Sequence, residues 1–315
     1  MIEEIKSLIV RNLGGKPFSV EKIGEGLVHR TYTFVFEDDD YVIQFSDPET
    51  DNERALERGS KFYDKSDQLS FPVPELVSGV NTAEIDGQEL KYYIAEKIEG
   101  KTFEKKITSD LAYQAGMMLA EIHEVEYEES GWLRHSEDSF EIQDFDEGSL
   151  RGWIISDNKK DADTLEENDM QKTAEKVRCF FENYGHHLPV DFQPVLCHND
   201  FSQDNILSKN GKITGIIDFD YAFSSHRQRD LVKAMNSFGL TDEELVSDLQ
   251  RGYREKSDLD ESFERNRLLY NVDTLNRIVA SAFRLKNEVT EGDRERYRRM
   301  LNEAIRKAEN QLEPK

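Results

Sequence analysis

Four polar residues near the middle of the chain have the types and the spacing that phosphoryl transfer requires. His198, Asp200 and Asn205 form the pattern H-x-D-x-x-x-x-N, and Asp218 ends an apolar run thirteen residues beyond Asn205. A phosphoryl transfer needs a carboxylate that orients the acceptor hydroxyl and oxygen ligands that hold Mg²⁺ near the phosphates. Asp200 can supply the first function, and Asn205 with Asp218 can supply the second.

Short strands and a tight turn are predicted to position these side chains. Residues 195–197 are apolar and lead into the pattern, residues 206–207 follow it, and residues 213–217 form the apolar run. Asn210-Gly211, between the last two segments, is a sequence typical of a two-residue hairpin turn. We therefore expect the polar side chains to lie at strand ends around one hairpin.

This segment resembles the catalytic and metal-binding loops of the aminoglycoside phosphotransferase family, which is related to the protein kinases. The resemblance implies an α+β, bilobal protein-kinase-like fold, with a small β-rich N-terminal lobe at residues 1–96 and a larger, mostly helical C-terminal lobe at residues 97–315. It also implies an enzyme that uses ATP and Mg²⁺ to phosphorylate a hydroxyl of a small molecule, such as an aminoglycoside, an amino alcohol or a sugar. In that reading Asp200 is the catalytic base, and Asn205 and Asp218 bind the metal.

The resemblance assigns nucleotide contacts to the N-terminal part of the chain. Residues 20–47 read as three strands, and the turn between the first two carries Gly24 and Gly26. In kinases such a turn lays backbone N–H groups over the phosphates of ATP. The segment Ala95-Glu96-Lys97 resembles the family's linker between lobes, where backbone groups pair with adenine.

One position departs from the family pattern. Kinases carry a lysine on the third strand that holds the phosphates and pairs with a glutamate of the next helix. The matching position here is Gln44, and Glu57 or Glu53 would be the acidic partner unless Gly59 occupies that place. A neutral amide can still donate hydrogen bonds to phosphate, although without the strength of a charged donor.

His198 and Asp230 are predicted to support the site. The ring of His198 is expected to brace the catalytic loop. The resemblance implies that Asp230 hydrogen-bonds this loop from below, although Asp230 could equally be the N-cap of a helix. His123 ends a predicted amphipathic helix over residues 111–122 and is expected to be packed or to cap that helix.

Periodicity predicts the secondary structure elsewhere. Apolar residues at helical spacing in residues 1–14, followed by Gly14-Gly15, predict an N-terminal helix. The acidic, weakly patterned run at residues 159–163 is predicted to be a solvated loop.

Other interpretations of the same residues remain open. Asp218-Phe219-Asp220 resembles the nucleophile motif of haloacid-dehalogenase phosphatases, but that motif expects Thr or Val where this chain has Ala222. A kinase-like protein that binds nucleotide and regulates without turnover is a further alternative. A zinc site would draw on residues whose spacing fits none of the usual zinc motifs, namely Cys179, His186, His187, Cys197 and His198.

The amino-acid composition limits the kinds of partner that the protein is expected to bind. The 315 residues carry a formal charge of −24, which disfavours nucleic acid and fits either a cationic acceptor or a saline environment. The sequence has no apolar run of eighteen residues, so no membrane partner is expected. Two cysteines without a framework of spacings favour a reducing cytoplasm. The acceptor itself and the oligomeric state cannot be read from the sequence.

Overall fold

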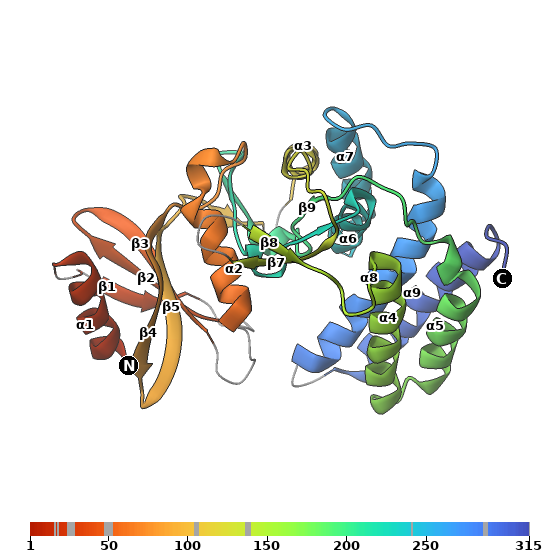
Figure 1. Ribbon diagram of the computed structural model, residues 1–315, viewed down its shortest axis with the longest axis horizontal. Coiled ribbons are helices and arrows are strands. Elements are labelled where there is room, and N and C mark those ends of the chain that lie inside the picture. Colours follow the sequence, from red (N-terminus) through yellow and green to blue (C-terminus); the bar gives the residue numbers. More distant parts are fainter. Residues whose placement is uncertain are drawn as a thin grey trace. The chain divides into compact units, whose positions relative to one another are not determined.

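The computed structural model describes residues 1–15, 17, 19–23, 29–46, 53–103, 107–135, 140–240, 242–285 and 289–314, with only the backbone of Glu53, Arg54 and His135. The chain divides into two compact units (Figure 1). The first, which we call the β-rich unit, comprises residues 1–106, 133–141 and 203–222; the second, the helical unit, comprises residues 107–132, 142–202 and 223–315. The strands of the first unit and the helices of the second confirm the predicted α+β class. A lobe boundary between residues 96 and 97 stays a prediction.

The β-rich unit is built on an antiparallel sheet with the strand order β1-β2-β3-β5-β4. Helix α1 covers one face of this sheet and helix α2 lies against the other (Figure 1). A second, three-stranded sheet has the order β11-β10-β6. The elements are α1 (Ile2–Leu13), β1 (Ser19–Lys22), β2 (His29–Phe36), β3 (Asp39–Ser46), α2 (Glu53–Asp64), β4 (Leu76–Ile85), β5 (Gln88–Glu96), β6 (Lys101–Thr102), β10 (Ile206–Lys209) and β11 (Lys212–Ile216), with short 3-10 turns at Ser66–Gln68, Gln203–Asn205 and Phe219–Tyr221.

Side-chain alternation in the main sheet determines which residues face α2. Ile43 and Phe45 of β3 point into the core under α1, together with Ile5 and Leu8 of that helix. Because successive strand residues point to opposite faces, Gln44 faces α2. The predicted N-terminal helix is confirmed, and Gly14 ends it in a left-handed conformation with φ of 80°.

The predicted hairpin around the catalytic motif is also confirmed. Strands β10 and β11 pair antiparallel, and Asn210 and Gly211 between them have φ of 53° and 78°. Positive φ at both positions is what a type I′ turn requires. The hairpin pairs on its other side with β6, while the strand before the motif belongs to a different sheet.

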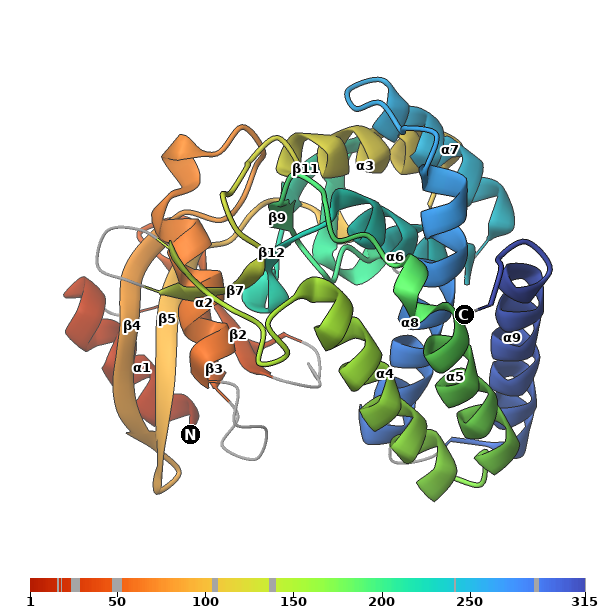
Figure 2. The same ribbon diagram turned by 45° about the vertical axis from the view of Figure 1, so that its right-hand side comes forward.

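Helices dominate the second unit (Figure 2). Within it, strand β12 pairs antiparallel with β9 and with the first two residues of β7. The predicted helix that ends at His123 is confirmed as α3. The elements are α3 (Ser109–Ile122), α4 (Leu150–Glu167), α5 (Gln171–Tyr184), β9 (Val195–Cys197), β12 (Phe223–Ser225), α6 (Arg227–Gly239), α7 (Glu243–Arg254), α8 (Phe263–Leu285) and α9 (Glu291–Glu309), while β7 (Gly131–His135) and β8 (Phe140–Gln143) each contain residues of both units.

The solvated loop predicted at residues 159–163 was wrong, because this stretch is the middle of α4. Lys159, Lys160 and Asp163 are exposed, but Asp161 and the preceding Asn158 are buried against α8. Asp161 accepts an ion pair from Arg284 at 2.8 Å, and Asn158 donates to a carboxylate of α8 at 2.6 Å. A helix whose buried face is polar lacks the apolar periodicity by which helices are predicted.

No helix in the described ranges combines the length and the apolar character needed to cross a bilayer.

Candidate active site

The residues His198 and Asp200 follow strand β9 in the helical unit. All three residues of β9 are buried, which fixes the point where the loop begins. The backbone N–H of Asp200 donates to Nδ1 of the buried His198 ring at 3.2 Å. The ring therefore holds the backbone of the loop next to the predicted base.

The buried carboxylate of Asp230, on α6, holds the same loop through its backbone. Its Oδ2 accepts from the N–H of His198 at 2.8 Å, and its Oδ1 accepts from the N–H of Asn199 at 2.9 Å. Asn199 has φ of 60°, a left-handed conformation that costs energy for a residue with a side chain. The two hydrogen bonds stabilise this strained turn immediately before Asp200.

The charge on Asp230 is maintained despite its burial. Burial alone would raise its pKa, but the hydrogen bond from His123 and the positive charge of Lys233 hold the pKa of Asp230 below its usual value. His123 lies 3.3 Å from this carboxylate through Nε2 and 2.8 Å from the Tyr253 hydroxyl through Nδ1. Burial lowers the pKa of His123 and favours its neutral form.

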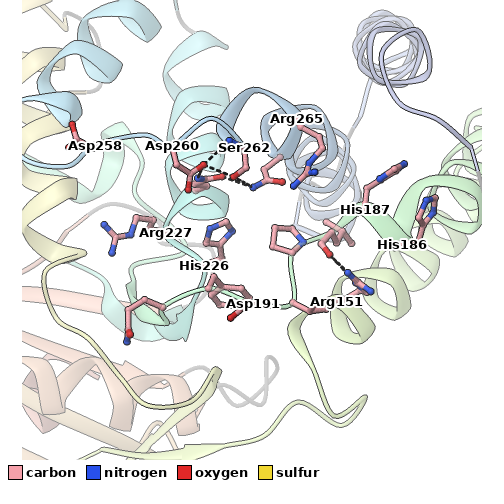
Figure 3. A pocket seen from close by; sticks show the side chains of 17 residues that line it. Arg151, His186, His187, Asp191, His226, Arg227, Asp258, Asp260, Ser262 and Arg265 are labelled. Carbon is pink, nitrogen blue, oxygen red and sulfur yellow. Dashed lines mark hydrogen bonds between the residues drawn. The ribbon is translucent and has the colours of Figure 1, made fainter.

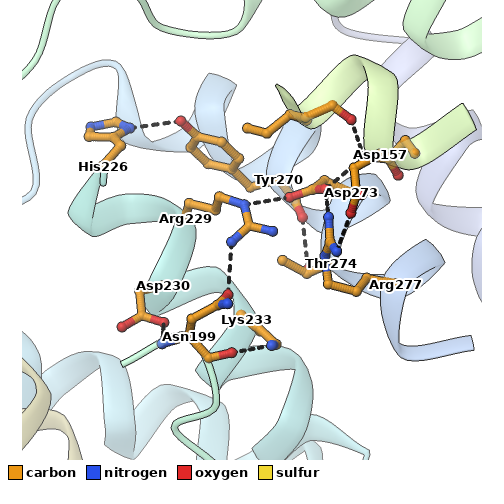
Figure 4. Close-up of polar contacts among 12 residues, drawn as sticks. Asp157, Asn199, His226, Arg229, Asp230, Lys233, Tyr270, Asp273, Thr274 and Arg277 are labelled. Carbon is orange, nitrogen blue, oxygen red and sulfur yellow. Dashed lines mark hydrogen bonds and ion pairs between the residues drawn. The ribbon is translucent and has the colours of Figure 1, made fainter. Parts of the chain in front are cut away.

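A second buried network reaches the loop from α6 and α8 (Figure 4). Arg229 donates to the side-chain oxygen of Asn199 at 3.0 Å and pairs with Asp273 at 2.8 Å. Both ends of the Arg229–Asp273 pair are almost fully buried, so loss of either would leave an uncompensated charge in the interior. Asn199 is therefore tied to the helical core through its side chain as well as its backbone.

Lys233 of α6 brings a positive charge next to Asp200. Its ammonium group donates to the main-chain oxygen of Asn199 (Figure 4). Burial lowers the pKa of Lys233, and the negative charge of Asp200 acts in the opposite direction. The ammonium group thus lies close enough to Asp200 to affect its carboxylate electrostatically.

Asn205 and Asp218 lie in the β-rich unit, at one end of the β10–β11 hairpin. Ile206 pairs with Ile216 in the hairpin register, and the N–H of Ile217 donates to the carbonyl of Asn205 at 3.0 Å. The pairing therefore places the two predicted metal ligands beside each other. Amide and carboxylate oxygens are the ligands that Mg²⁺ prefers, so the two side chains fit that ion chemically.

The backbone at Asp218 turns sharply. Asp218 has φ of 66° and ψ of 61°, and its N–H donates to the Tyr63 hydroxyl of α2 at 3.0 Å. Phe219 packs against Phe62 of α2 with ring centroids 4.7 Å apart. The orientation of the Asp218 carboxylate thus depends on contacts between this turn and α2.

Gln44 and Glu57 do not contact each other. The side-chain oxygen of Gln44 accepts from the Tyr93 hydroxyl of β5 at 2.6 Å. Glu57 pairs at 2.8 Å with Lys91, a lysine of β5 that faces the same side of the sheet. Gly59 has no side chain that could pair with Gln44. The space beside it is taken by Asp220, because a Cβ at Gly59 would lie 2.0 Å from a carboxylate oxygen of Asp220.

The predicted nucleotide contacts are described in part. The N–H groups of Glu96 and Lys97 donate to the carbonyls of Glu75 at 2.8 Å and Asp40 at 2.9 Å. The N–H groups of Glu96 and Lys97 are therefore already engaged, and the adenine contact of this segment stays a prediction. Residues 24–28, with Gly24 and Gly26, lie outside the described residues, as does the side chain of Glu53.

The helical unit contains a pocket of about 630 Å³ away from the residues of the catalytic motif (Figure 3). Charged groups of both signs line it, among them Arg227, Arg265, Asp258 and Asp260. Burial lowers the pKa of His226, at its inner wall, to about 4. The mixed charges match no single ligand class.

The zinc alternative finds little support in the described part of the chain. The one cluster found there with three possible ligands comprises His123, Cys197 and Asp230, and only Cys197 belongs to the set predicted from sequence. The Asp230 oxygens already accept from loop N–H groups, and burial raises the pKa of the Cys197 thiol well above its usual value. A neutral thiol is a poor zinc ligand.

Comparison with known proteins identifies the family. The sequence model described as the phosphotransferase enzyme family matches residues 19–265, so the chain belongs to this family, and the recognition from the motif is confirmed. Similar curated proteins are a homoserine kinase of Neisseria meningitidis serogroup B, 24% identical over 147 residues that span 46% of this chain and 43% of that protein, and an aminoglycoside 3'-phosphotransferase of Escherichia coli, 27% identical over 173 residues that span 52% and 57%. The chain thus matches about half the length of these relatives.

Solved structures agree on the fold. A thermostable mutant of aminoglycoside phosphotransferase APH(4)-Ia, in ternary complex with ADP and hygromycin B, superposes with a TM-score of 0.72 at 15% identity. The superposition covers 97% of this chain and 99% of that one. The predicted protein-kinase-like fold is therefore confirmed.

Sequence reasoning missed four residues of these networks: His29, Asp220, Arg229 and Lys233. Asp220 was considered only as part of a phosphatase motif, yet it is buried and contacts His29 at 2.5 Å. A signal existed only for Arg229 and Lys233, which lie on either side of the apolar Leu231 and Val232, since charges within an apolar segment are often buried and paired.

The Asp230 geometry leads to a test of stability. Asp230→Ala leaves two buried N–H groups without acceptors and should lower the free energy of unfolding by roughly 3 to 5 kcal/mol in urea titrations. Because its folded pKa is lowered, the contribution of the wild-type carboxylate is fully present above the unfolded pKa of about 4 and is lost as the pH falls through the folded value. Asp230→Asn should lose less stability and lack this pH dependence.

The matched control is Asp163→Ala, which removes a carboxylate that is 65% exposed in its ion pair with Arg178. Such a pair contributes only about 0 to 1 kcal/mol. If Asp230→Ala cost no more than this control, the loop would not depend on Asp230.

Proposed function

We propose that this protein transfers the γ-phosphoryl group of MgATP to a hydroxyl group of a small molecule. The observation that carries the proposal is that buried contacts fix both parts of the motif, the loop before Asp200 and the turn at Asp218. Asp230 holds the backbone before Asp200, and α2 holds the turn at Asp218. Phosphoryl transfer depends mainly on positioning and on electrostatic stabilisation, so loops fixed in this way suit it.

In this proposal Asp200 is the catalytic base. Its carboxylate accepts the proton of the acceptor hydroxyl as the oxygen of that hydroxyl bonds to the γ-phosphorus, while the bond from that phosphorus to the bridging oxygen breaks and ADP leaves. The ammonium group of Lys233 lies near this carboxylate and places a positive charge beside it. Four residues separate Asp200 from Asn205, so one loop would connect the base to the metal site.

Asn205 and Asp218 would hold Mg²⁺. When bound, the ion neutralises charge that develops on the phosphates. The protein would contribute two hard oxygen ligands, and a backbone hydrogen bond joins Asn205 to Ile217, the residue before Asp218. An Asp in the left-handed region can be replaced by Asn without new backbone strain, which makes Asp218→Asn a clean probe of the charge.

The nucleotide is proposed to contact Gln44, the backbone of Ala95 to Lys97, and the turn with Gly24 and Gly26. The side-chain oxygen of Gln44 is taken by Tyr93, so its NH₂ group would be the part directed at phosphate. Solved structures of similar fold hold ADP or AMP-PNP, which supports an adenine nucleotide here.

The acceptor is proposed to be a small hydroxyl-bearing molecule, and the charge of −24 favours one that carries an amine. The relatives named above as homoserine and aminoglycoside kinases support this class. A nucleotide-binding regulator without turnover is the second candidate, because Gln44 lacks the charge of the usual lysine.

The first functional prediction concerns the metal. Isothermal calorimetry should detect ATP binding with Mg²⁺ and much weaker binding with EDTA, because the paired oxygen ligands act through the cation. Asp218→Asn should reduce the Mg²⁺-dependent part of the affinity. Absence of binding under both conditions would refute the kinase proposal and favour an interaction protein.

The second prediction concerns the base. Asp200→Asn should reduce turnover by roughly two to four orders of magnitude, as expected for a positioned general base, while MgATP affinity stays nearly unchanged. Asp204→Asn, an exposed carboxylate of the same loop, is the matched control and should keep most of the activity.

Each outcome separates the candidates. Equal activity in Asp200→Asn and the wild type would remove Asp200 from the chemistry. A covalent phosphate trapped on Asp218 would support the phosphatase alternative. Metal-dependent binding without turnover on any acceptor would support the regulator.

A further inference from the structure

The buried histidine at the start of β2 has no role in the function proposed so far. His29 follows the predicted phosphate-binding turn directly in sequence. In the sheet register His29 lies opposite Ser46, and Thr31 lies opposite Gln44. Because alternate residues of a strand share one face, His29 faces the same side of the sheet as Gln44, toward α2.

His29 makes a direct contact with the turn that carries Asp218. Its Nε2 lies 2.5 Å from Oδ2 of Asp220, two residues beyond Asp218. The contact is shielded from water, since His29 is 7% exposed and Asp220 is 1% exposed. The strand after the glycine turn and the turn of the predicted metal ligand are therefore connected by one ion pair.

Helix α2 is part of the same arrangement. The missing side chain of Gly59 lets the other oxygen of Asp220 approach the helix backbone, where a Cβ would lie 2.0 Å from that oxygen. Arg58 of α2 donates to the main-chain oxygen of Asp220 and, at 2.7 Å, to that of Leu133. Asp220 thus joins β2, α2 and the turn at Asp218.

The surroundings of His29 favour its charged form. Burial lowers the pKa of His29, but the hydrogen bond with Asp220 and the negative charges of Asp220 and Asp218 outweigh it and raise the pKa above the usual value. The other ionisable groups around this arrangement are Arg58 and Tyr63 of α2, Tyr93 of β5 and Arg134 of β7. Burial raises the pKa of both tyrosines, so they stay neutral and the imidazolium faces two carboxylates.

We propose that the His29 imidazolium, paired with Asp220, takes over from the absent lysine at position 44 as the cation that couples the phosphate-binding strand and α2 to the metal-binding turn. The candidates for the usual acidic partner support this, because Glu57 is engaged by Lys91 and Gly59 has no side chain. The side chain of Glu53, the other candidate acid, lies outside the described residues. His29 is a positioning residue, which acts on the nucleotide through Asp218. The inference rests on the proposed function.

The test compares MgATP affinity by calorimetry between about pH 6 and pH 9 for the wild type, His29→Gln and Asp220→Asn. Wild-type affinity should fall as the pH rises through the raised pKa of His29. His29→Gln keeps a hydrogen-bond donor without the charge, and it should bind roughly ten- to a hundredfold more weakly with no such fall. Exposed His186→Gln should behave as the wild type.

Stability supplies a readout that does not involve nucleotide. Because the folded pKa of His29 is raised, its contribution is fully present below the unfolded pKa of about 6.5 and is lost as the pH rises through the folded value. Urea titrations should show this loss in the wild type and not in His29→Gln, whose folded fraction they also report.

The possible results separate a failure of the proposed role of His29 from a failure of the kinase proposal. If the wild type binds MgATP and His29→Gln binds it equally with the same pH dependence, the role of His29 is refuted and the kinase proposal stands. If the wild type binds no nucleotide at any pH, both are refuted.

Discussion

A carboxylate that is removed from water has to be matched by donors inside the protein, and this requirement shapes both loops of the proposed active site. In the helical unit Asp230 is matched by the N–H groups of His198 and Asn199, which fixes the backbone just before Asp200. In the β-rich unit Asp220 is matched by His29, which fixes the turn just after Asp218. Neither buried carboxylate is proposed to react, yet each holds the backbone next to a proposed site residue, the base Asp200 or the metal ligand Asp218.

This division of roles explains how the chain can tolerate strained backbone at its proposed site. Asn199 and Asp218 both have positive φ, near 60° and 66°, and each lies within two residues of a buried ion pair or its hydrogen bonds. Strain of this kind persists only where surrounding contacts determine the conformation. The energy of the buried networks is therefore used to hold Asp200 and Asp218 in place before any ligand arrives, as preorganised catalysis requires.

Sequence reasoning succeeded where the signal is local and failed where it depends on pairing across long distances. The hairpin at Asn210 and Gly211 and the family itself could be recognised from spacing and turn chemistry. The α4 helix could not, because its buried Asn158 and Asp161 look like surface residues until their partners on α8 are known. The His29–Asp220 pair joins positions 191 residues apart, and no local pattern indicates it.

The most direct test of the account is transfer of label from γ-phosphate-labelled ATP, with Mg²⁺, to a panel of aminoglycosides, amino alcohols and sugars, at low and high salt. If the protein is a phosphotransferase with Asp200 as its base, we expect an organic phosphate ester with one class of acceptor and loss of that product in Asp200→Asn. Label that stays in ATP with every acceptor, or a product that forms equally in Asp200→Asn, would contradict it.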